Sequence, residues 1–400
     1  MLEKLISLHQ EVISTTPAGI QRHLVNQINW QAQAICLIGG RGVGKTTLMC
    51  QHLLQHYKDV SEALYFSADN IYIASKGLFA IAEEYFKFGG KALFIDEVHK
   101  YPNWEIEIKN IIDTYRKKQI VFSGSSSINL HKSKADLSRR VVYYELKGLS
   151  FREYLHFNDV ISIPTTTLPN LLKNHLSLAN QLTGITILKH FRDYLIHGYF
   201  PFFLEGTQDY LSKLNNVIEK VIFEDIAVIY NLKQSTLPIL KKLLWLTASS
   251  VGLIPNIDNI SRNISVSREV IYNCFDYLHS AGLINNLYAD ATGMKLIRKP
   301  GKIFLENTNL LYAINGSIKL DSDVGNIRET FFVNQTLSAH RVNLHDKGDF
   351  ILDGKYTIEV GGRNKDFKQI KSIEESYLAL DNIEIGFGSK IPLYLFGFLY

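Results

Sequence analysis

The sequence has 400 residues, of which 46% are hydrophobic and 20% charged, and its formal net charge is +4. This length predicts two to four domains, and so slight a charge excludes a strongly basic or acidic protein, so any argument for a nucleic-acid partner must rest on local clusters. No apolar run is long enough to cross a bilayer, and residues 1–13 lack an apolar signal core, so we expect a cytoplasmic protein.

The cysteines are few and widely spaced. Cys36, Cys50 and Cys274 show no paired spacing that would indicate a disulfide framework or a zinc site. We therefore expect them to behave as small core hydrophobes in a reducing compartment.

A phosphate-binding loop is predicted near the N-terminus. The pattern G-x-x-x-x-G-K-[ST] is matched, with its neighbours, by Gly39, Gly40, Arg41, Gly42, Val43, Gly44, Lys45, Thr46 and Thr47. An apolar run at 34–38 precedes the loop, and helical periodicity at 47–57 follows it. Backbone N–H groups in such a loop point at phosphates, and the helix adds its positive end. We expect Lys45 to reach the β- and γ-phosphates of ATP, Thr46 to hold Mg²⁺, and Arg41 to face solvent.

Two acidic residues end a later buried strand. After a predicted strand at 63–66 and a helix at 78–86, the sequence reads Lys91-Ala92-Leu93-Phe94-Ile95-Asp96-Glu97. In a parallel sheet these acids would emerge at the carboxyl end of the strand, beside the phosphates. We expect Asp96 to hold Mg²⁺ and Glu97 to polarise the attacking water as a general base.

A serine-rich loop follows the next strand. A helix at 104–115 leads to a strand at 119–122 and then to Ser123-Gly124-Ser125-Ser126-Ser127. A hydroxyl at this strand end could sense the γ-phosphate, with Ser125 preferred and Ser123 second. The alternative is a Ser/Gly loop that caps the next helix.

At this point the chain resembles AAA+-type ATPases of archaea and bacteria that carry a C-terminal domain of unknown function. The resemblance lies in Gly39 to Thr47, Leu93 to His99 with Pro102 and Trp104, Ser123 to Ser126, Leu137 to Arg140, Leu149 to Leu155 and Gly198 to Pro201. It implies that an Arg after the serine loop is a finger or sensor, a position that Arg140 matches best, with Arg139 as its neighbour. A guanidinium there would neutralise charge on the transferred phosphoryl group, whereas the alternative is a surface ion pair.

The middle of the chain has helical patterns. Candidate helices at 151–157, 168–181 and 187–197 suggest a helical lid attached to the nucleotide domain. A second helical unit begins at 237–249 and continues with helices at 256–261 and 267–279.

Two predicted strands, 283–288 and 295–304, complete the order that is typical of a winged helix. Its candidate DNA contacts are Arg268, Asn273 and His279 on the recognition helix and Lys295, Arg298, Lys299 and Lys302 on the wing. A winged helix that serves as a rigid adaptor is an equal alternative.

The C-terminal part resembles the hairpin of PD-(D/E)XK nucleases. After a helix at 326–337, Asp349 and Glu359 lie on two strands joined near an Asp-Gly turn, and in that superfamily such acids hold Mg²⁺. A two-residue loop would pair Asp349 with Ile358, whereas a three-residue loop would place it opposite Glu359. The motif's lysine position is Gly361, so we expect a retained fold with lost or weakened cleavage.

The expected fold class is α/β: an AAA+-like P-loop domain at 1–148, a helical lid at 149–235, a winged helix at 236–304 and a nuclease-like domain at 305–400. The expected function is ATP binding and hydrolysis with Mg²⁺, coupled to nucleic-acid engagement. The alternative is a nucleotide-driven switch that recognises a protein partner, and a weaker option is an ATP-gated nuclease. A homo-oligomer is compatible with either, and no membrane partner is expected.

Overall fold

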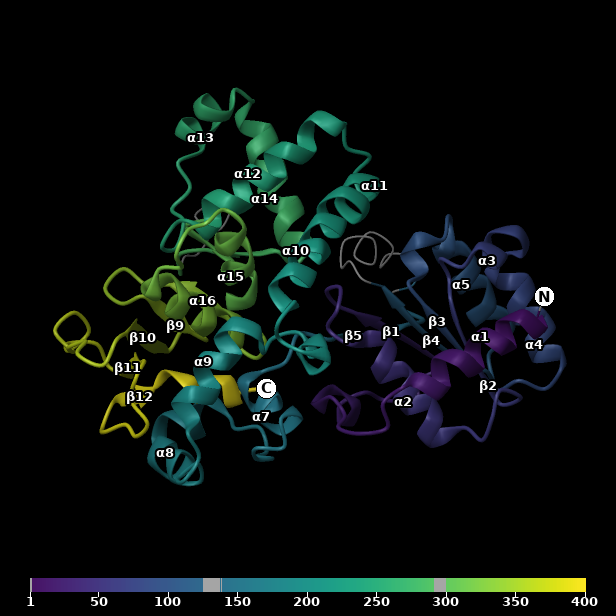
Figure 1. Ribbon diagram of the computed structural model, residues 1–400, viewed down its shortest axis with the longest axis horizontal. Coiled ribbons are helices and arrows are strands. Elements are labelled where there is room, and N and C mark those ends of the chain that lie inside the picture. Colours follow the sequence, from purple (N-terminus) through teal and green to yellow (C-terminus); the bar gives the residue numbers. More distant parts are fainter. Residues whose placement is uncertain (1, 125–136, 138, 291–299) are drawn as a thin grey trace. The chain divides into compact units, whose positions relative to one another are not determined.

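The computed structural model describes residues 2–124, 137, 139–290 and 300–400. The chain forms two compact units, Met1–Gly148 and Leu149–Tyr400 (Figure 1). Among the described residues, no helix combines the length and the hydropathy that crossing a bilayer requires. Cys36, Cys50 and Cys274 are buried free thiols.

The first unit alternates strands with helices. Its elements are α1 (Leu2–Thr15), η1 (His23–Asn26), β1 (Ala34–Ile38), α2 (Lys45–His56), β2 (Ala63–Ser67), α3 (Ile71–Lys76), α4 (Leu78–Lys87), β3 (Ala92–Asp96), η2 (Val98–Lys100), α5 (Trp104–Thr114), β4 (Gln119–Gly124) and β5 (Val142–Glu145). The predicted strands and helices at 34–122 are present, whereas β5 and α3 were not predicted. Strand β5 has exposed and half-buried residues, so it lacks the apolar run that marks β1, β3 and β4.

The described strands of this unit form a parallel sheet in the order β2-β3-β4-β1-β5. All five residues of β1 and of β3 are buried, as expected for parallel strands with both faces covered. Because the strands are parallel, their carboxyl ends share one edge of the sheet. Register brings Ser67 beside Asp96 and Ile38 beside Gly124, so the ends of four strands lie at the edge of the sheet that carries the phosphate loop. The predicted α/β fold of the P-loop type is therefore confirmed.

The second unit begins with helices. They are α7 (Phe151–Phe157), α8 (Leu168–Asn180), α9 (Ile187–His197), η3 (Pro201–Glu205), α10 (Tyr210–Lys220), the π-helical η4 (Val221–Ile226), α11 (Ala227–Ile229), η5 (Gln234–Thr236), α12 (Leu237–Ala248), α13 (Ile257–Ile264) and α14 (Arg268–Ser280). Helix α7 begins with a capping box between Ser150 and Glu153. The Phe151 N–H donates to Gln335 Oε1 at 3.1 Å, which ties α7 to the C-terminal part of the same unit.

The remaining elements are β6 (Ile284–Leu287), β7 (Lys302–Leu305), α15 (Thr308–Ser317), α16 (Val324–Leu337), β8 (Val342–Leu344), β9 (Phe350–Leu352), β10 (Tyr356–Gly361), β11 (Ser376–Leu380), β12 (Lys390–Pro392) and η7 (Leu393–Phe398). Strands β6 and β7 are antiparallel and follow α12, α13 and α14, which is the predicted order of elements. Strand β7 begins at Lys302, so the predicted strand at 295–304 is too long where it crosses Pro300 and Gly301. Its residues 295–299 lie outside the described part of the chain.

A mixed sheet organises the C-terminal part, in the order β12-β11-β10-β9-β8. Strand β10 is antiparallel to β9 and parallel to β11. Buried aromatic rings of α16 and η7 pack on this sheet, for example Phe332 with Phe350 at 5.2 Å and with Phe396 at 4.9 Å between ring centroids. This core fixes α16 beside the hairpin that carries Asp349 and Glu359.

Candidate functional site

The phosphate loop curls between β1 and α2. Gly42 and Gly44 have φ of 80° and 98°, a conformation that glycine adopts without strain. A Cβ on Gly39 would lie 2.3 Å from the Leu146 carbonyl oxygen, so no side chain fits there. The buried Lys45 side chain donates from Nζ to the Gly39 and Gly40 carbonyl oxygens at 2.9 Å each. The carbonyl oxygens of the phosphate loop therefore hold the Lys45 ammonium beside the start of the loop.

Arg22 stabilises the phosphate loop by hydrogen bonds to backbone carbonyl groups, a role that the sequence did not predict. It is 6% exposed and donates to the carbonyl oxygens of Val43 at 2.7 Å, Lys147 at 2.7 Å and Gly148 at 2.9 Å. An isolated Arg far from any motif gives no signal in the sequence. Its planar, multi-donor guanidinium suits the joining of several carbonyl groups.

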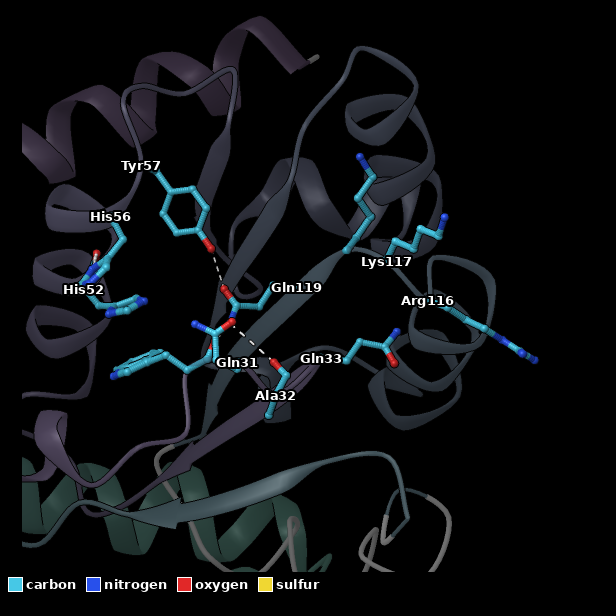
Figure 2. Close-up of a pocket in the computed structure, with 11 residues that line it drawn as sticks. Gln31, Ala32, Gln33, His52, His56, Tyr57, Arg116, Lys117 and Gln119 are labelled. Carbon is cyan, nitrogen blue, oxygen red and sulfur yellow. Dashed lines mark hydrogen bonds between the residues drawn. The ribbon is translucent and has the colours of Figure 1, made fainter.

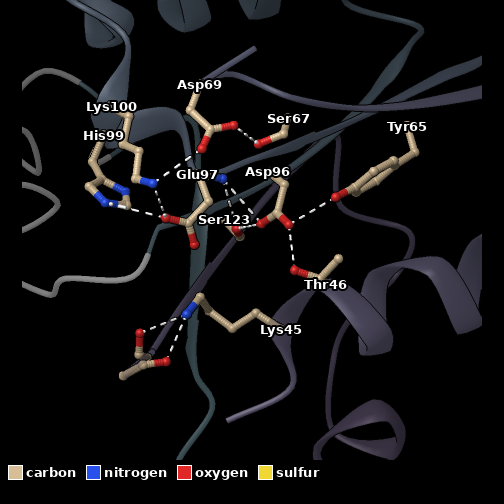
Figure 3. Close-up of polar contacts among 12 residues, drawn as sticks. Lys45, Thr46, Tyr65, Ser67, Asp69, Asp96, Glu97, His99, Lys100 and Ser123 are labelled. Atoms are coloured by element: carbon tan, nitrogen blue, oxygen red, sulfur yellow. Dashed lines mark hydrogen bonds and ion pairs between the residues drawn. The ribbon is translucent and has the colours of Figure 1, made fainter. Parts of the chain in front are cut away.

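Asp96 lies at the end of β3 and is the centre of the polar network in Figure 3. Its Oδ2 accepts from Thr46 Oγ1 at 2.5 Å and from the Tyr65 hydroxyl at 3.0 Å. Its Oδ1 accepts from Ser123 Oγ and, at 3.1 Å, from the Glu97 N–H. The structure thus joins the phosphate loop to three neighbouring strand ends through one carboxylate.

Glu97 adopts a left-handed backbone conformation, with φ of 52° and ψ of 38°. Its N–H donates to Asp96 and, at 3.2 Å, to Ser123 Oγ. Burial raises the pKa of the Glu97 carboxyl, while the cations Lys45, Lys100 and Arg41 and the Asp96 carboxylate act on it with opposite signs. Arg41 is half-buried, and its charge lowers the pKa of this carboxyl.

Two basic side chains follow Glu97 in η2. Its Oε2 lies 3.5 Å from His99 Nε2 and 4.0 Å from Lys100 Nζ. Lys100 Nζ also contacts Asp69 Oδ2 at 3.1 Å, and the other oxygen of Asp69 accepts from Ser67 Oγ at 2.6 Å. Figure 3 shows Lys100 between the two carboxylates. The loop after β2 is therefore linked to the predicted general base.

The remaining predicted residues lie elsewhere. The Arg140 guanidinium donates to both carboxylate oxygens of Asp113 on α5, at 2.7 and 3.1 Å, and Arg139 is exposed. Ser125 lies outside the described residues, whereas Ser123, the second choice, contacts Asp96. The finger assignment of Arg140 stays a prediction.

The residues present suit a magnesium nucleotide. A glycine-lined loop that a Cβ would fill, a buried lysine and a helix N-terminus can surround phosphate oxygens. A threonine hydroxyl and a carboxylate in mutual contact offer the oxygen ligands that Mg²⁺ prefers.

A cavity of about 390 Å³ lies at the opposite, amino-end edge of the sheet (Figure 2). Gln33, just before β1, and Gln119, the first residue of β4, both line it. On one wall the Trp30 and His52 rings stack at 3.5 Å between centroids. Burial lowers the pKa of His52 to about 3, so this wall is neutral at pH 7. The cavity contains none of the predicted site residues.

Of the described DNA-contact candidates, Asn273 is exposed, and the other three make contacts within the second unit. Arg268 pairs with Asp258 at 2.5 Å, and Lys302 pairs with Glu329 of α16 at 3.1 Å. The His279 ring contacts the Ile284 carbonyl oxygen. Lys295, Arg298 and Lys299 lie outside the described residues.

The hairpin of β9 and β10 has the three-residue loop that was one of two alternatives. Tyr356 pairs with Leu352 and Ile358 with Phe350, so the next pair along the ladder is Asp349 with Glu359. Asp349 Oδ2 accepts from the Val360 N–H at 2.8 Å. The two acids therefore lie together at the end of the paired region.

Lys365 reaches this hairpin from the loop that follows β10. Its Nζ lies 2.6 Å from Glu359 Oε1, and a Cβ on Gly361 would lie 2.8 Å from the Lys365 stem. The side chain thus covers the position where the motif would place its lysine, although it comes from the loop after β10 and not from the strand itself. Burial raises the pKa of Glu359, and Lys365 opposes that shift. Among the described residues, no group of three or more His, Cys, Asp or Glu side chains is arranged to hold a metal ion.

Two family models match the chain. Residues 31–155 match an AAA domain, and residues 188–321 match a domain of unknown function (DUF8612). The second match crosses the predicted boundaries at 235 and 304. Neither match extends past residue 321, so the nuclease resemblance of residues 305–400 has no support beyond the hairpin itself.

Two relatives are from Methanocaldococcus jannaschii. The chain is 28% identical over 395 residues to its uncharacterized protein MJ1637, covering 91% of this chain and 82% of that one. It is 23% identical over 422 residues to the uncharacterized protein MJ1544, covering 96% and 89%.

Solved structures also resemble the chain. The Walker-type ATPase PABY2304 of Pyrococcus abyssi aligns with a TM-score of 0.40 and 11% identity, over 73% of this chain and 93% of that one. AMPPCP-bound DnaA from Aquifex aeolicus aligns with a TM-score of 0.27 and 16% identity, over 69% and 88%. The parallel sheet and the phosphate loop give the first unit the fold of a P-loop domain, and its residues 31–155 are similar to an AAA domain.

Proposed function

We propose that the first unit binds ATP with Mg²⁺ and hydrolyses it. The observation that carries the proposal is the contact between Thr46 of the phosphate loop and Asp96 at the end of β3. This contact brings together the two halves of a phosphoryl-transfer site that lie 50 residues apart in the sequence. Bound Mg²⁺ would neutralise phosphate charge in this site, with Thr46 and Asp96 as its protein ligands.

The chain's own residues divide the remaining work. Lys45 is held by the loop carbonyls in the free protein, and its ammonium would move to the β- and γ-phosphate oxygens. Glu97 would take a proton from the attacking water, and its raised pKa makes it a stronger base than an exposed glutamate. Ser123 contacts both Asp96 and the Glu97 N–H, so it is placed to sense the γ-phosphate.

Steady-state hydrolysis tests this proposal. Lys45→Ala should weaken ATP binding, whereas Glu97→Gln should keep binding and lower kcat by roughly 10²–10⁴-fold, because it removes only the base. The matched control is Glu11→Gln, an exposed glutamate of α1 in the same unit, which should leave kcat unchanged. Equal hydrolysis by Glu97→Gln and wild type would contradict the assignment.

We infer a second candidate function, nucleic-acid engagement by the second unit under the control of nucleotide state. The supporting observation is the Lys365 ammonium on Glu359, beside Asp349, because two carboxylates and a lysine are the groups that metal-assisted phosphodiester cleavage uses. Asp349 and Glu359 would be the ligands of a bound Mg²⁺. The motif has Gly361 at its lysine position, which predicts lost or weakened cleavage. The second unit could therefore bind nucleic acid at Asp349, Glu359 and Lys365 without cleaving it.

End-labelled DNA and RNA, incubated at low salt with Mg²⁺ and with ATP or ADP, separate these outcomes. Cleavage should disappear in Glu359→Ala and Lys365→Met but persist in Lys368→Met, whose lysine is exposed and pairs with Asp366. Binding without cleavage should fall on charge reversal at Arg298 and Lys299. Absence of both binding and cleavage at low salt would exclude this function and favour a nucleotide-driven switch that recognises a protein.

A further inference from the structure

Strand β2 contributes a side chain to the candidate site that no sequence motif marks. Tyr65 is 5% exposed, and its hydroxyl donates to Asp96 Oδ2 at 3.0 Å. Its own N–H donates to the Nδ1 of the buried His9 at 3.0 Å, so the backbone of the residue is anchored as well. Figure 3 shows the ring reaching from β2 to the carboxylate.

Nucleotide binding would affect the two hydrogen bonds to Asp96 Oδ2 differently. Thr46 shares Oδ2 with Tyr65, and its hydroxyl is the group that would turn to a metal. The Tyr65 hydroxyl is not expected to bind the metal, so its hydrogen bond to Asp96 would remain.

Orientation of this carboxylate matters for affinity. A carboxylate held by a donor on each oxygen has little freedom to rotate, so less conformational entropy is lost when it engages a cation. Ser123 fixes Oδ1, and Tyr65 fixes Oδ2 independently of Thr46.

We propose that Tyr65 is a positioning residue that holds Asp96 in place for Mg²⁺ when a nucleotide is bound. The inference rests on the proposed function of the first unit and assigns to β2 a part in it. Loss of the hydroxyl lowers the affinity for Mg²⁺ in the presence of nucleotide while the nucleotide itself still binds.

The test compares two buried tyrosines of the same unit. Tyr65→Phe removes the hydroxyl on Asp96, and Tyr85→Phe removes a hydroxyl that donates to the Val60 carbonyl oxygen at 2.7 Å. Tyr85 is 3% exposed, so both changes delete one hydroxyl from a buried ring. A purely structural role for Tyr65 predicts the same behaviour for both variants.

The readout is the thermal stability of the full-length protein with saturating ADP, titrated with Mg²⁺, which involves no turnover. The Mg²⁺ concentration that gives half of the stabilisation should rise about 3- to 30-fold in Tyr65→Phe, as expected for one lost hydrogen bond to a charged group. It should stay at the wild-type value in Tyr85→Phe. An unchanged midpoint in Tyr65→Phe would overturn the inference.

A second measurement guards against a folding defect. In an Asp96→Asn background, adding Tyr65→Phe should produce no further change in the Mg²⁺ midpoint, because the positioned carboxylate is already gone. A further shift of the same size as in the wild-type background would overturn the inference. Failure of the wild-type protein to respond to ADP and Mg²⁺ at all would instead refute the proposed function.

Discussion

His9 is a buried acceptor whose protonation state couples α1 to the strand that supports the site. Its Nδ1 accepts from the Tyr65 N–H, which requires the ring to be neutral at that nitrogen. Burial lowers the pKa of His9 from 6.5 to about 4. Between pH 6.5 and pH 4, His9 is protonated in the unfolded chain but neutral in the folded protein. The free energy of unfolding must therefore fall as the pH falls through this window.

His9→Asn should therefore flatten the acid limb of stability. Asparagine can still accept the Tyr65 N–H but cannot be protonated. We expect denaturant unfolding to show that wild type loses up to about 3 kcal/mol more than the variant between pH 6.5 and 4. An identical pH slope in the two proteins would contradict the assignment.

At this scale, part of the site could be predicted from the sequence. Lys45, Thr46, Asp96 and Glu97 are recognisable because their positions relative to a strand end are encoded in consecutive residues. Tyr65 and Arg22 are not, since their contacts depend on which strands are neighbours and on register. The place of Lys365 could not be predicted either, because the path of the loop after β10 decides where its ammonium lies.

The phosphate loop is built against the segment that follows β5. The Leu146 N–H donates to the Ile38 carbonyl oxygen at 2.7 Å, and the Leu146 carbonyl oxygen faces Gly39. The residues that directly follow β1 and β5 therefore meet at the start of the phosphate loop. Shape at this position depends on glycine for space rather than for a left-handed backbone.

Gly39→Ala and Gly40→Ala form a matched pair for this contact. The Cβ at residue 39 would collide with backbone at 2.3 Å, whereas at residue 40 its nearest neighbour is Val43 Cγ1 at 3.7 Å. We expect Gly39→Ala to lower the free energy of unfolding by about 2–4 kcal/mol and to weaken ATP binding at least tenfold. Gly40→Ala should change both far less, as measured by denaturant unfolding and equilibrium nucleotide binding. Equal effects of the two changes would contradict the packing argument.

The bounds of helices and strands were predicted best where the sequence pattern is strong. The buried strands β1 and β3 and the helices α7, α9 and α16 lie within a few residues of their predicted ranges because their apolar patterns define them, and α7 and α16 also begin with a side-chain cap. Strand β5 was missed since it is a short, partly exposed strand at the edge of the sheet. The hairpin register was left between two alternatives, and the pairing of Leu352 with Tyr356 shows the longer loop.

The whole molecule divides after Gly148, where the predicted nucleotide domain also ends. Beyond that point, the helices predicted as a lid pack within the same compact unit as the C-terminal sheet, for instance through Phe191 on Phe331 at 4.7 Å between ring centroids. Long-range aromatic contacts of this kind have no local signature in a sequence. The helices predicted as a separate lid therefore belong to the second unit.

Nucleotide recovered from the full-length protein tests the central claim most directly. Protein is incubated with Mg²⁺ and labelled ATP, separated from free nucleotide, denatured and analysed for bound ATP and ADP. Wild type and Glu11→Gln should yield mainly ADP, and Glu97→Gln should yield ATP at the same occupancy, because the phosphate cradle is intact and the base is absent. Recovery of ADP from Glu97→Gln at the wild-type rate, or no bound nucleotide in wild type, would contradict the account.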